Sequence, residues 1–127
     1  MVAGIGIDIV AISRIRRAAA RSGGRFLTRV FTEREREHCL ARSDPHPCLA
    51  ARFAAKEAVL KALGSGVANC HWQDVEILQT TSGMPVVRLS GGAAAIARAL
   101  GVEQVLVSLA HEKEHAVAFA VALKGAE

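Results

Sequence analysis

Four charged residues stand inside a stretch that otherwise has the composition of a buried helix. The stretch RFAAKEAVLKAL (52–63) is rich in alanine and leucine, yet it carries Arg52, Lys56, Glu57 and Lys61. On a helical wheel, alanines occupy one side and larger apolar residues the other, with the charges inside or beside the larger arc. Buried charges are costly unless they are paired or bound to a ligand. Three cations against one carboxylate therefore predict that this helix binds a polyanion, for which phosphate is the natural candidate.

A simpler interpretation needs no ligand. Glu57 and Lys61 are four residues apart, so they can form an ion pair on the helix surface that contributes about 0.2–0.5 kcal/mol. The long side chains of Arg52 and Lys56 can reach water from the edge of an apolar face. The role of Lys56 stays open: it touches the ligand, or it pairs with a neighbouring carboxylate.

A second carboxylate lies near the N-terminus, in a predicted strand over residues 2–10. Its alternation places Ile5, Ile7 and Ile9 on one face and Gly4, Gly6 and Asp8 on the other. Because glycine has no side chain, we expect an open face on which a metal or ligand can approach Asp8. Asp8 and Glu57 would then supply two oxygen ligands to Mg²⁺, which takes its other ligands from water and phosphate. The alternative is a strand-end carboxylate that pairs with a nearby arginine.

A histidine follows the end of a later predicted strand. In SLAHEKEHA (108–116), His111 stands in a polar turn, where a histidine is usually a surface residue. It gains a functional interpretation only if that turn lies beside the phosphate site.

Hydrophobic periodicity and turn residues predict the elements that must position these groups. Strands are expected over 2–10, 74–80, 85–90, 104–110 and 115–123. Helices are expected over 11–21, 25–31, from Thr32, over 48–63 and over 91–100. Thr32 and Glu35 form a capping box, Pro47 suits the first turn of the long helix, Gly64 its C-terminal cap, and Ser90 the N-cap of the last helix.

The order of these elements predicts an α+β fold, with a mostly antiparallel sheet packed against a long central helix. The last strand carries alanines on one face and larger apolar residues on the other. We therefore expect both of its faces to be covered, the alanine face very closely. The length of 127 residues fits a single domain over 1–127.

Composition limits the partners. The formal net charge is +4, and residues 9–31 hold six arginines without an acidic residue, which favours an acidic partner. Aromatic residues are too few for base-stacking platforms, so we expect no nucleic acid. The sequence has no apolar run of membrane-spanning length and no secretory signal, so we expect a soluble cytoplasmic protein without a membrane partner. Three cysteines without a CxxC pair are expected to be buried thiols, not a disulfide framework or a zinc site.

Four motifs occur in order over nearly the whole chain: GIGIDIVAISRI, RFAAKEAVLKALGSG, WQDVEI and VSLAHEKEHAVA. Together they strongly resemble the holo-[acyl-carrier-protein] synthases, the small bacterial 4′-phosphopantetheinyl transferases. The resemblance implies transfer of the 4′-phosphopantetheine arm of coenzyme A to a serine of apo acyl carrier protein, with release of adenosine 3′,5′-bisphosphate. It also implies Mg²⁺ and a homotrimer with active sites at subunit interfaces.

Site residues follow from the same resemblance. It implies that Asp8 and Glu57 bind the metal and that Glu57, Lys61 and His111 act in catalysis. Substrate contacts are implied at Arg52, Lys61, Gly64, Ser65, Gly66 and His111. The resemblance places the carrier protein on the first helix, where Arg14, Arg17 and Arg21 form one stripe at i, i+3 and i+7. A solvated basic face is the alternative for that stripe.

Three positions depart from the family pattern, namely Met84, Leu106 and Ala110, where the family often has lysine, histidine and a hydroxyl residue. These departures affect fine contacts to coenzyme A, not the reaction class. Two other classes remain open: a non-catalytic basic module that binds an acidic partner, and a metal-dependent phosphohydrolase that uses the same site. The sequence also leaves open whether the carrier serves fatty acid biosynthesis or polyketide synthesis.

Overall fold

The computed structural model describes residues 1–21, 23–64 and 70–126. Its strands are β1 (Val2–Ala11), β2 (Val75–Gln79), β3 (Pro85–Leu89), β4 (Val102–His111) and β5 (His115–Lys124). Its helices are α1 (Ile12–Arg21), α2 (Arg25–Val30), α3 (Glu33–Leu40), α4 (His46–Ala62), the short 3-10 turn η2 (Trp72–Asp74) and α5 (Gly91–Leu100). Each of these helices and strands apart from η2 was predicted from the sequence.

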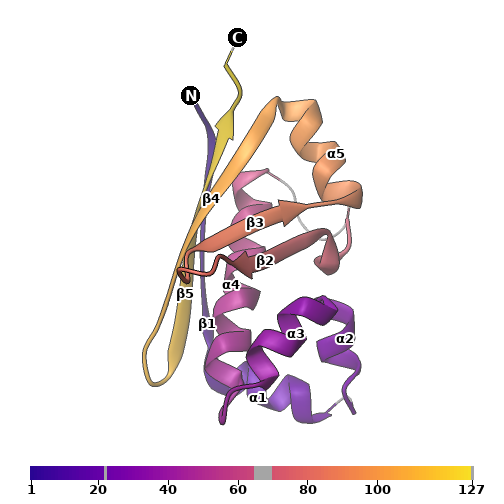
Figure 1. Cartoon of the computed structure of the whole chain (residues 1–127), viewed down its shortest axis with the longest axis vertical. Coiled ribbons are helices and arrows are strands. Elements are labelled where there is room, and N and C mark those ends of the chain that lie inside the picture. Colours follow the sequence, from indigo (N-terminus) through magenta and orange to yellow (C-terminus); the bar gives the residue numbers. More distant parts are fainter. Residues whose placement is uncertain (22, 65–69, 127) are drawn as a thin grey trace.

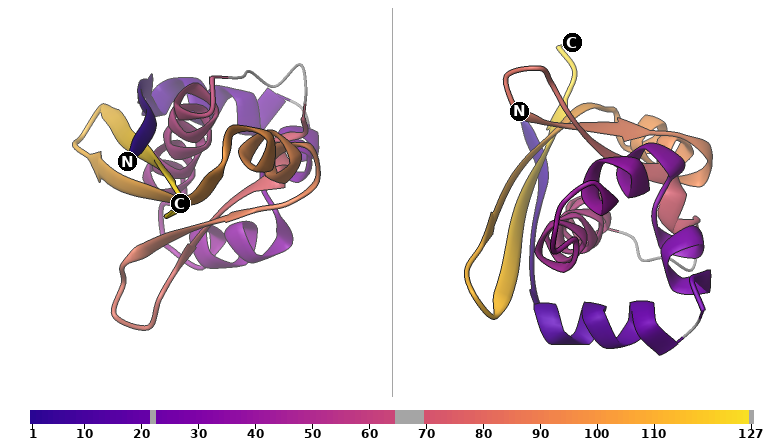
Figure 2. Two further views of the ribbon diagram at one scale, coloured as in Figure 1. Left: turned by 90° about the horizontal axis from the view of Figure 1, so that it is seen from above. Right: turned by 60° about the horizontal axis from the view of Figure 1, so that its bottom comes forward.

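The strands form two antiparallel sheets around the central helix α4, which confirms the predicted α+β fold (Figure 1). The larger sheet has the strand order β1-β5-β4, and the β2–β3 hairpin forms the second sheet. Figure 2 shows α4 enclosed by the large sheet on one side, by α1 at its end, and by α2, α3 and the hairpin on the other side. This enclosure explains why most of α4 is apolar, whereas Glu57 and Lys61 lie on the part of the helix that stays partly exposed.

Small residues allow α4 to lie directly on the large sheet. In the strand register, Gly4 and Gly6 of β1 stand beside Ala122 and Ala120 of β5, and both alanines are fully buried. A Cβ atom added to Gly6 would lie 2.9 Å from the carbonyl carbon of Ala58 and closer still to its oxygen. The expectation of an open glycine face was therefore wrong, because the backbone of α4 fills the space that the missing side chains leave.

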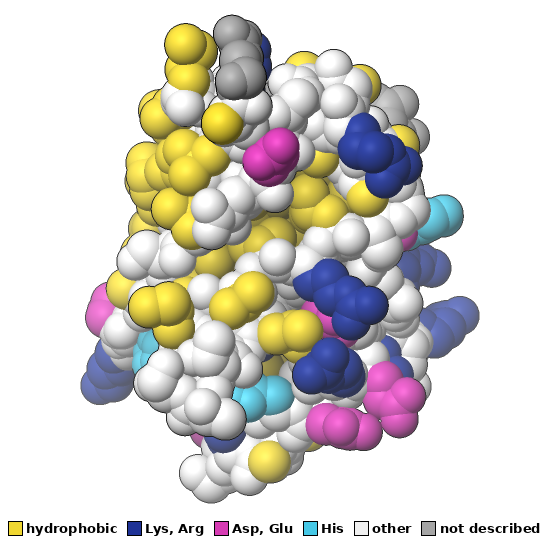
Figure 3. Space-filling model, turned by 45° about the horizontal axis from the view of Figure 1, so that its top comes forward, with side chains coloured by type: hydrophobic (Ala, Val, Ile, Leu, Met, Phe, Trp, Pro, Cys, Tyr) yellow, Lys and Arg dark blue, Asp and Glu magenta, His cyan; other side chains and the backbone are white. Residues whose placement is uncertain are grey.

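The opposite face of the same sheet is uncovered and apolar in the single chain. Ile5, Ile7 and Ile9 are 58–65% exposed, and Phe119 and Leu106 lie on the same face and are exposed as well. Figure 3 shows hydrophobic side chains gathered at the upper left of the surface, on the side where the strands of the sheet lie. The expectation that β5 is covered on both faces is thus correct only for its alanine face within one chain.

A disulfide between Cys39 and Cys48 joins the end of α3 to the start of α4. The expectation of three thiols was wrong for this pair. An odd cysteine count without a familiar spacing carries no information about two helices that fold back on each other. The turn between α3 and α4 brings the Cα atoms of Cys39 and Cys48 to 5.5 Å, a normal separation for a disulfide.

The predicted helix ends are mostly confirmed. Thr32 and Glu35 form the capping box of α3, and Gly64 follows α4 with a φ of +70°. Ser90 occupies the N-cap position of α5, but its side chain makes no capping bond. The carboxylate of Asp74 takes that role, since its Oδ2 accepts a hydrogen bond from the Gly92 amide at 3.1 Å. No helix among the described residues is long and apolar enough to cross a membrane.

Candidate functional site

The first group of predicted site residues lies where the middle of β1 meets α4. Asp8 leaves β1 on the side that faces α4, and its Oδ1 lies 3.2 Å from Lys61 Nζ. Lys61 also donates a hydrogen bond to the carbonyl of Ile7 at 2.9 Å. The Lys61 side chain is about half exposed, so it can reach a ligand in solvent while it keeps contact with β1. Asp8 thus pairs with a lysine of α4, not with an arginine.

Glu57 lies within electrostatic range of this pair. Burial raises the pKa of the Glu57 carboxyl, and the nearby Asp8 charge raises it further, while Lys61 and Arg14 oppose the shift. Asp8 and Glu57 are like charges close to each other, and a small divalent metal ion held by both would relieve their repulsion. We call Asp8, Glu57 and Lys61 the carboxylate half-site.

The second group lines a cavity of about 300 Å³ between the start of α4, the β2–β3 hairpin and the end of β4. Arg52 and His111 lie in its wall together with Arg42 and Gln79. His111 thus lies beside two arginines, and the condition set by its sequence context is met only if this cavity binds a phosphate. We call Arg42, Arg52 and His111 the arginine half-site.

Arg52 is the distinctive residue of this cavity. It is only 4% exposed, and its Nη1 donates a hydrogen bond to Cys48 Sγ at 3.2 Å. Its Nε has no hydrogen-bond partner within the described part of the chain. Burial lowers the pKa of the guanidinium, Glu35 opposes that change, and Arg42 adds to it. A buried guanidinium with an unused donor at a cavity wall is an arrangement that an anion would complete.

The two half-sites do not meet within one chain. Arg52 and Lys61 are nine residues apart, about two and a half helical turns, so they project from opposite sides of α4. Asp8 belongs to β1 and His111 to β4, which form the two edges of the β1-β5-β4 sheet. The expectation that the three cations of this helix serve one polyanion was therefore wrong for a single chain.

Lys56 takes no part in either half-site. Its Nζ lies 2.8 Å from Glu35 Oε1, and both side chains are completely buried. Of the two roles left open by the sequence, the structure supports pairing with a carboxylate.

The loop after α4 is described only at its start. Gly64 is exposed and comes two residues after the end of α4, whereas Ser65 and Gly66 lie outside the described residues.

The arginines of α1 are placed as the periodicity predicts. Arg14, Arg17 and Arg21 are all exposed, whereas Ile12 and Ile15 of the same helix are buried. Arg16 leaves the helix in another direction and pairs with Asp44 at 3.2 Å. The stripe ends beside the carboxylate half-site, since Arg14 is one of the charges that act on Glu57.

Two of the three departures from the family pattern lie away from the arginine half-site. Met84 and Leu106 line a separate cavity between β3, α5 and β4, whereas Ala110 lines the wall beside His111.

Sequence reasoning overlooked Arg42, because a loop arginine before Pro45 belongs to no periodic pattern. It joins the pocket because the chain turns back between α3 and α4, where the Cys39–Cys48 disulfide closes the loop.

Comparison with known proteins supports the family resemblance over almost the whole chain. The profile of the 4′-phosphopantetheinyl transferase superfamily matches residues 4–120. A holo-[acyl-carrier-protein] synthase of Desulforudis audaxviator is 54% identical over 127 residues, which cover all of this chain and 97% of that protein. The crystal structure of the Neisseria meningitidis synthase superposes with a TM-score of 0.89 at 33% identity, covering 98% of this chain and 100% of that one. The Helicobacter pylori synthase in complex with coenzyme A gives a TM-score of 0.83 at 29% identity, covering 94% and 99%.

Proposed function

The chain belongs to the holo-[acyl-carrier-protein] synthases of the 4′-phosphopantetheinyl transferase superfamily, and on this premise we propose the details of its reaction. It transfers the 4′-phosphopantetheine arm of coenzyme A to a serine hydroxyl of an apo acyl carrier protein and releases adenosine 3′,5′-bisphosphate. The observation that carries this proposal is that two carboxylates, Asp8 and Glu57, lie near each other and beside the half-exposed Lys61. Two carboxylates can hold a metal ion, and the lysine can bind a phosphate. The synthase of H. pylori binds coenzyme A, which agrees with this choice of donor.

Asp8 and Glu57 would hold Mg²⁺, which supplies charge neutralisation for the diphosphate of coenzyme A when it is bound. Lys61 would donate a hydrogen bond to the phosphate that leaves with the nucleotide, and the half-exposed side chain supports this role. The carrier serine oxygen forms the new bond to the pantetheine-side phosphorus while the bond to the leaving phosphate breaks. We also propose that Glu57 accepts the serine proton as general base.

The arginine half-site would bind the nucleotide end of coenzyme A, with the unused donor of Arg52 directed to a phosphate. Because it lies on the other side of α4, we propose that the complete site forms between two chains of a homotrimer. The exposed apolar face of the sheet, with Ile5, Ile7 and Ile9, offers the surface for that assembly. In a closed ring, the carboxylate half-site of one chain meets the arginine half-site of the next.

Mixed trimers test this arrangement. Asp8→Ala and Arg52→Ala are each expected to be inactive alone, while co-expression of the two variants restores about a quarter of wild-type activity, because random mixing gives that fraction of interfaces two intact half-sites. The readout is the rate of carrier modification by purified mixed trimers. A co-expressed mixture as inactive as the separate variants would place both half-sites in the same chain.

The stripe of Arg14, Arg17 and Arg21 would receive an acidic helix of the carrier protein. We expect Arg17→Glu with Arg21→Glu to lower the association rate for the carrier about tenfold or more at low salt, and to reduce its dependence on ionic strength. Stopped-flow binding at several salt concentrations measures both effects. Arg98→Glu on the remote helix α5 is the control, with half the change in net charge. A loss in that variant of half the size on a logarithmic scale would show that only net charge matters.

One experiment separates the proposed reaction from its rivals. The protein is incubated with apo carrier protein, coenzyme A and Mg²⁺, and the carrier is weighed by mass spectrometry. A carrier that gains the phosphopantetheine arm supports transfer. Free phosphopantetheine with an unchanged carrier supports a phosphohydrolase, and no change in either supports a binding module.

A further inference from the structure

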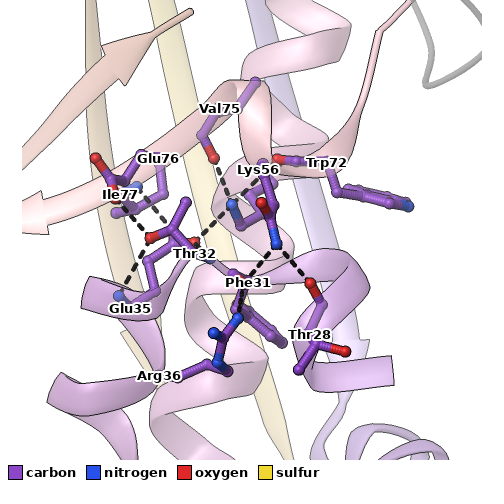
Figure 4. A network of polar contacts seen from close by, with 11 residues as sticks. Thr28, Phe31, Thr32, Glu35, Arg36, Lys56, Trp72, Val75, Glu76 and Ile77 are labelled. Atoms are coloured by element: carbon purple, nitrogen blue, oxygen red, sulfur yellow. Dashed lines mark hydrogen bonds and ion pairs between the residues drawn. The ribbon is translucent and has the colours of Figure 1, made fainter. Parts of the chain in front are cut away.

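Glu35 of α3 is the centre of a buried polar network (Figure 4). Its Oε1 accepts hydrogen bonds from the Thr32 amide and from Lys56 Nζ, both at 2.8 Å. Its Oε2 accepts one from the Ile77 amide at 2.9 Å. An ionised carboxylate has about four acceptor positions, so one of them remains available on Oε2.

Lys56 uses all of its donors inside this network. Besides Glu35, its Nζ donates to the carbonyls of Trp72, at 3.2 Å, and of Val75, and it lies 5.8 Å from the centre of the Phe31 ring. Burial lowers the pKa of Lys56, while the charge of Glu35 and the hydrogen bond to it raise the pKa. An ammonium group with three donors and three partners has none left for a ligand.

Arg52 lies close to the same carboxylate. It is four residues before Lys56 and therefore stands on the same face of α4, one turn away. The Glu35 charge opposes the effect of burial on the pKa of Arg52, as expected for a carboxylate near the guanidinium. Two buried cations thus lie near one buried carboxylate. Lys56 contacts that carboxylate directly, whereas Arg52 points to the cavity and to Cys48.

We propose that Lys56 is a positioning residue: by occupying Glu35 it keeps the Arg52 guanidinium free to bind a phosphate of coenzyme A. Without Lys56, Glu35 is a buried carboxylate with no direct cationic partner, which is strongly unfavourable. Arg52 then turns toward Glu35 and the free acceptor position on Oε2, and the cavity loses its unused donor. The ligand in this inference rests on the proposed function, whereas the movement of Arg52 does not.

Three variants test the inference: Lys56→Met, Glu35→Gln and the double variant with both changes. We expect Lys56→Met to raise the Kd for coenzyme A, measured by calorimetry, about tenfold or more, because a charge-assisted hydrogen bond is lost. The KM for coenzyme A rises with it, while kcat at saturating coenzyme A changes less than threefold, in keeping with a loss of ground-state binding. Glu35→Gln alone keeps the Kd within about threefold of wild type, because the carboxylate that would capture Arg52 is gone.

The double variant provides the decisive comparison. If Lys56 acts by occupying Glu35, the double variant regains a Kd within about threefold of wild type, although it has lost both partners of the ion pair. If Lys56 only stabilises the fold, the second change adds to the first, and the double variant binds coenzyme A as weakly as Lys56→Met or more weakly. The second result would overturn the inference.

A crystal structure of Lys56→Met gives a readout that does not depend on coenzyme A. The expected result is a hydrogen bond between the Arg52 guanidinium and Glu35; a guanidinium that stays beside Cys48 Sγ overturns the inference. If Lys56→Met does not fold, the double variant and Glu35→Gln still test the inference. Weak coenzyme A binding by either of these variants, in folded form, contradicts it. A wild-type protein that binds no coenzyme A would refute the proposed function, and the position of Arg52 would still test the role of Lys56.

Discussion

Replacement of Glu57 by glutamine is expected to lower the rate of phosphopantetheine transfer by about 10²–10³-fold or more, while the protein stays folded. The amide keeps the size and one oxygen of the side chain but removes the negative charge that would hold Mg²⁺ and accept the serine proton. Mass spectrometry of the carrier protein over time, at a fixed Mg²⁺ concentration, measures the loss. Glu103→Gln, which changes an exposed glutamate at the start of β4, is the matched control and should keep the wild-type rate.

The same variant should not be less stable than the wild type when the metal is absent. The pKa of Glu57 is raised in the folded protein, first by burial and then by Asp8, so the folded state holds a proton more tightly than the unfolded state does. The stability that this group contributes is therefore present below the pKa of an unfolded glutamate and is lost as the pH rises through the raised value. At neutral pH the ionised carboxylate is a cost to folding, which glutamine avoids.

Thermal unfolding at neutral pH without Mg²⁺ is thus expected to give Glu57→Gln a midpoint equal to or above that of the wild type. Loss of transfer together with unchanged or improved stability would identify Glu57 as a functional residue that the fold does not require. Near-normal transfer would remove Glu57 from the metal site, and a lower midpoint would show that its charge stabilises the fold.

The sequence predicted the elements well because each one has a local cause. The alternation of isoleucine with Gly4, Gly6 and Asp8 marked β1, and the Thr32–Glu35 capping box marked the start of α3. Asp8, Glu57 and Lys61 were grouped by ligand chemistry and helical spacing, and the family resemblance gave the same group. The structure brings Asp8 into contact with Lys61 and places Glu57 within electrostatic range of Asp8. These predictions needed only neighbours in sequence or a known motif.

Contacts between distant segments were not predictable in the same way. Lys56 stood out as a misplaced charge, but no periodicity indicates that its partner is Glu35, which lies 21 positions earlier on another helix. The Cys39–Cys48 disulfide depends in the same way on how α3 turns back onto α4. The division of the site was, in contrast, already contained in the helical wheel, because Arg52 and Lys61 are nine residues apart and so must point in opposite directions.

The glycines of β1 carry the largest expected effect on stability. A Cβ atom at position 6 would lie 2.9 Å from the Ala58 carbonyl carbon and from the Ala62 amide nitrogen, which are backbone atoms of α4. Since β1 and β5 pack closely on α4, the helix and β1 cannot separate at Gly6 without loss of packing along the sheet. We therefore expect Gly6→Ala to lower the free energy of unfolding by about 3 kcal/mol or more, a large share of the stability of a small domain.

Urea unfolding followed by circular dichroism measures this change, and Gly125→Ala is the matched control for the substitution. A Cβ atom at position 125 would overlap the carboxylate of Glu103 and lie 2.7 Å from its Cγ, but this is the side chain of an exposed residue that can rotate away. We expect that control to change the free energy of unfolding by less than about 0.5 kcal/mol. Equal urea midpoints for the two variants would mean that β1 and α4 can separate without cost. Because Asp8 is two residues from Gly6 on the same face of β1, such a separation would also predict a carboxylate half-site that is not held rigidly against α4.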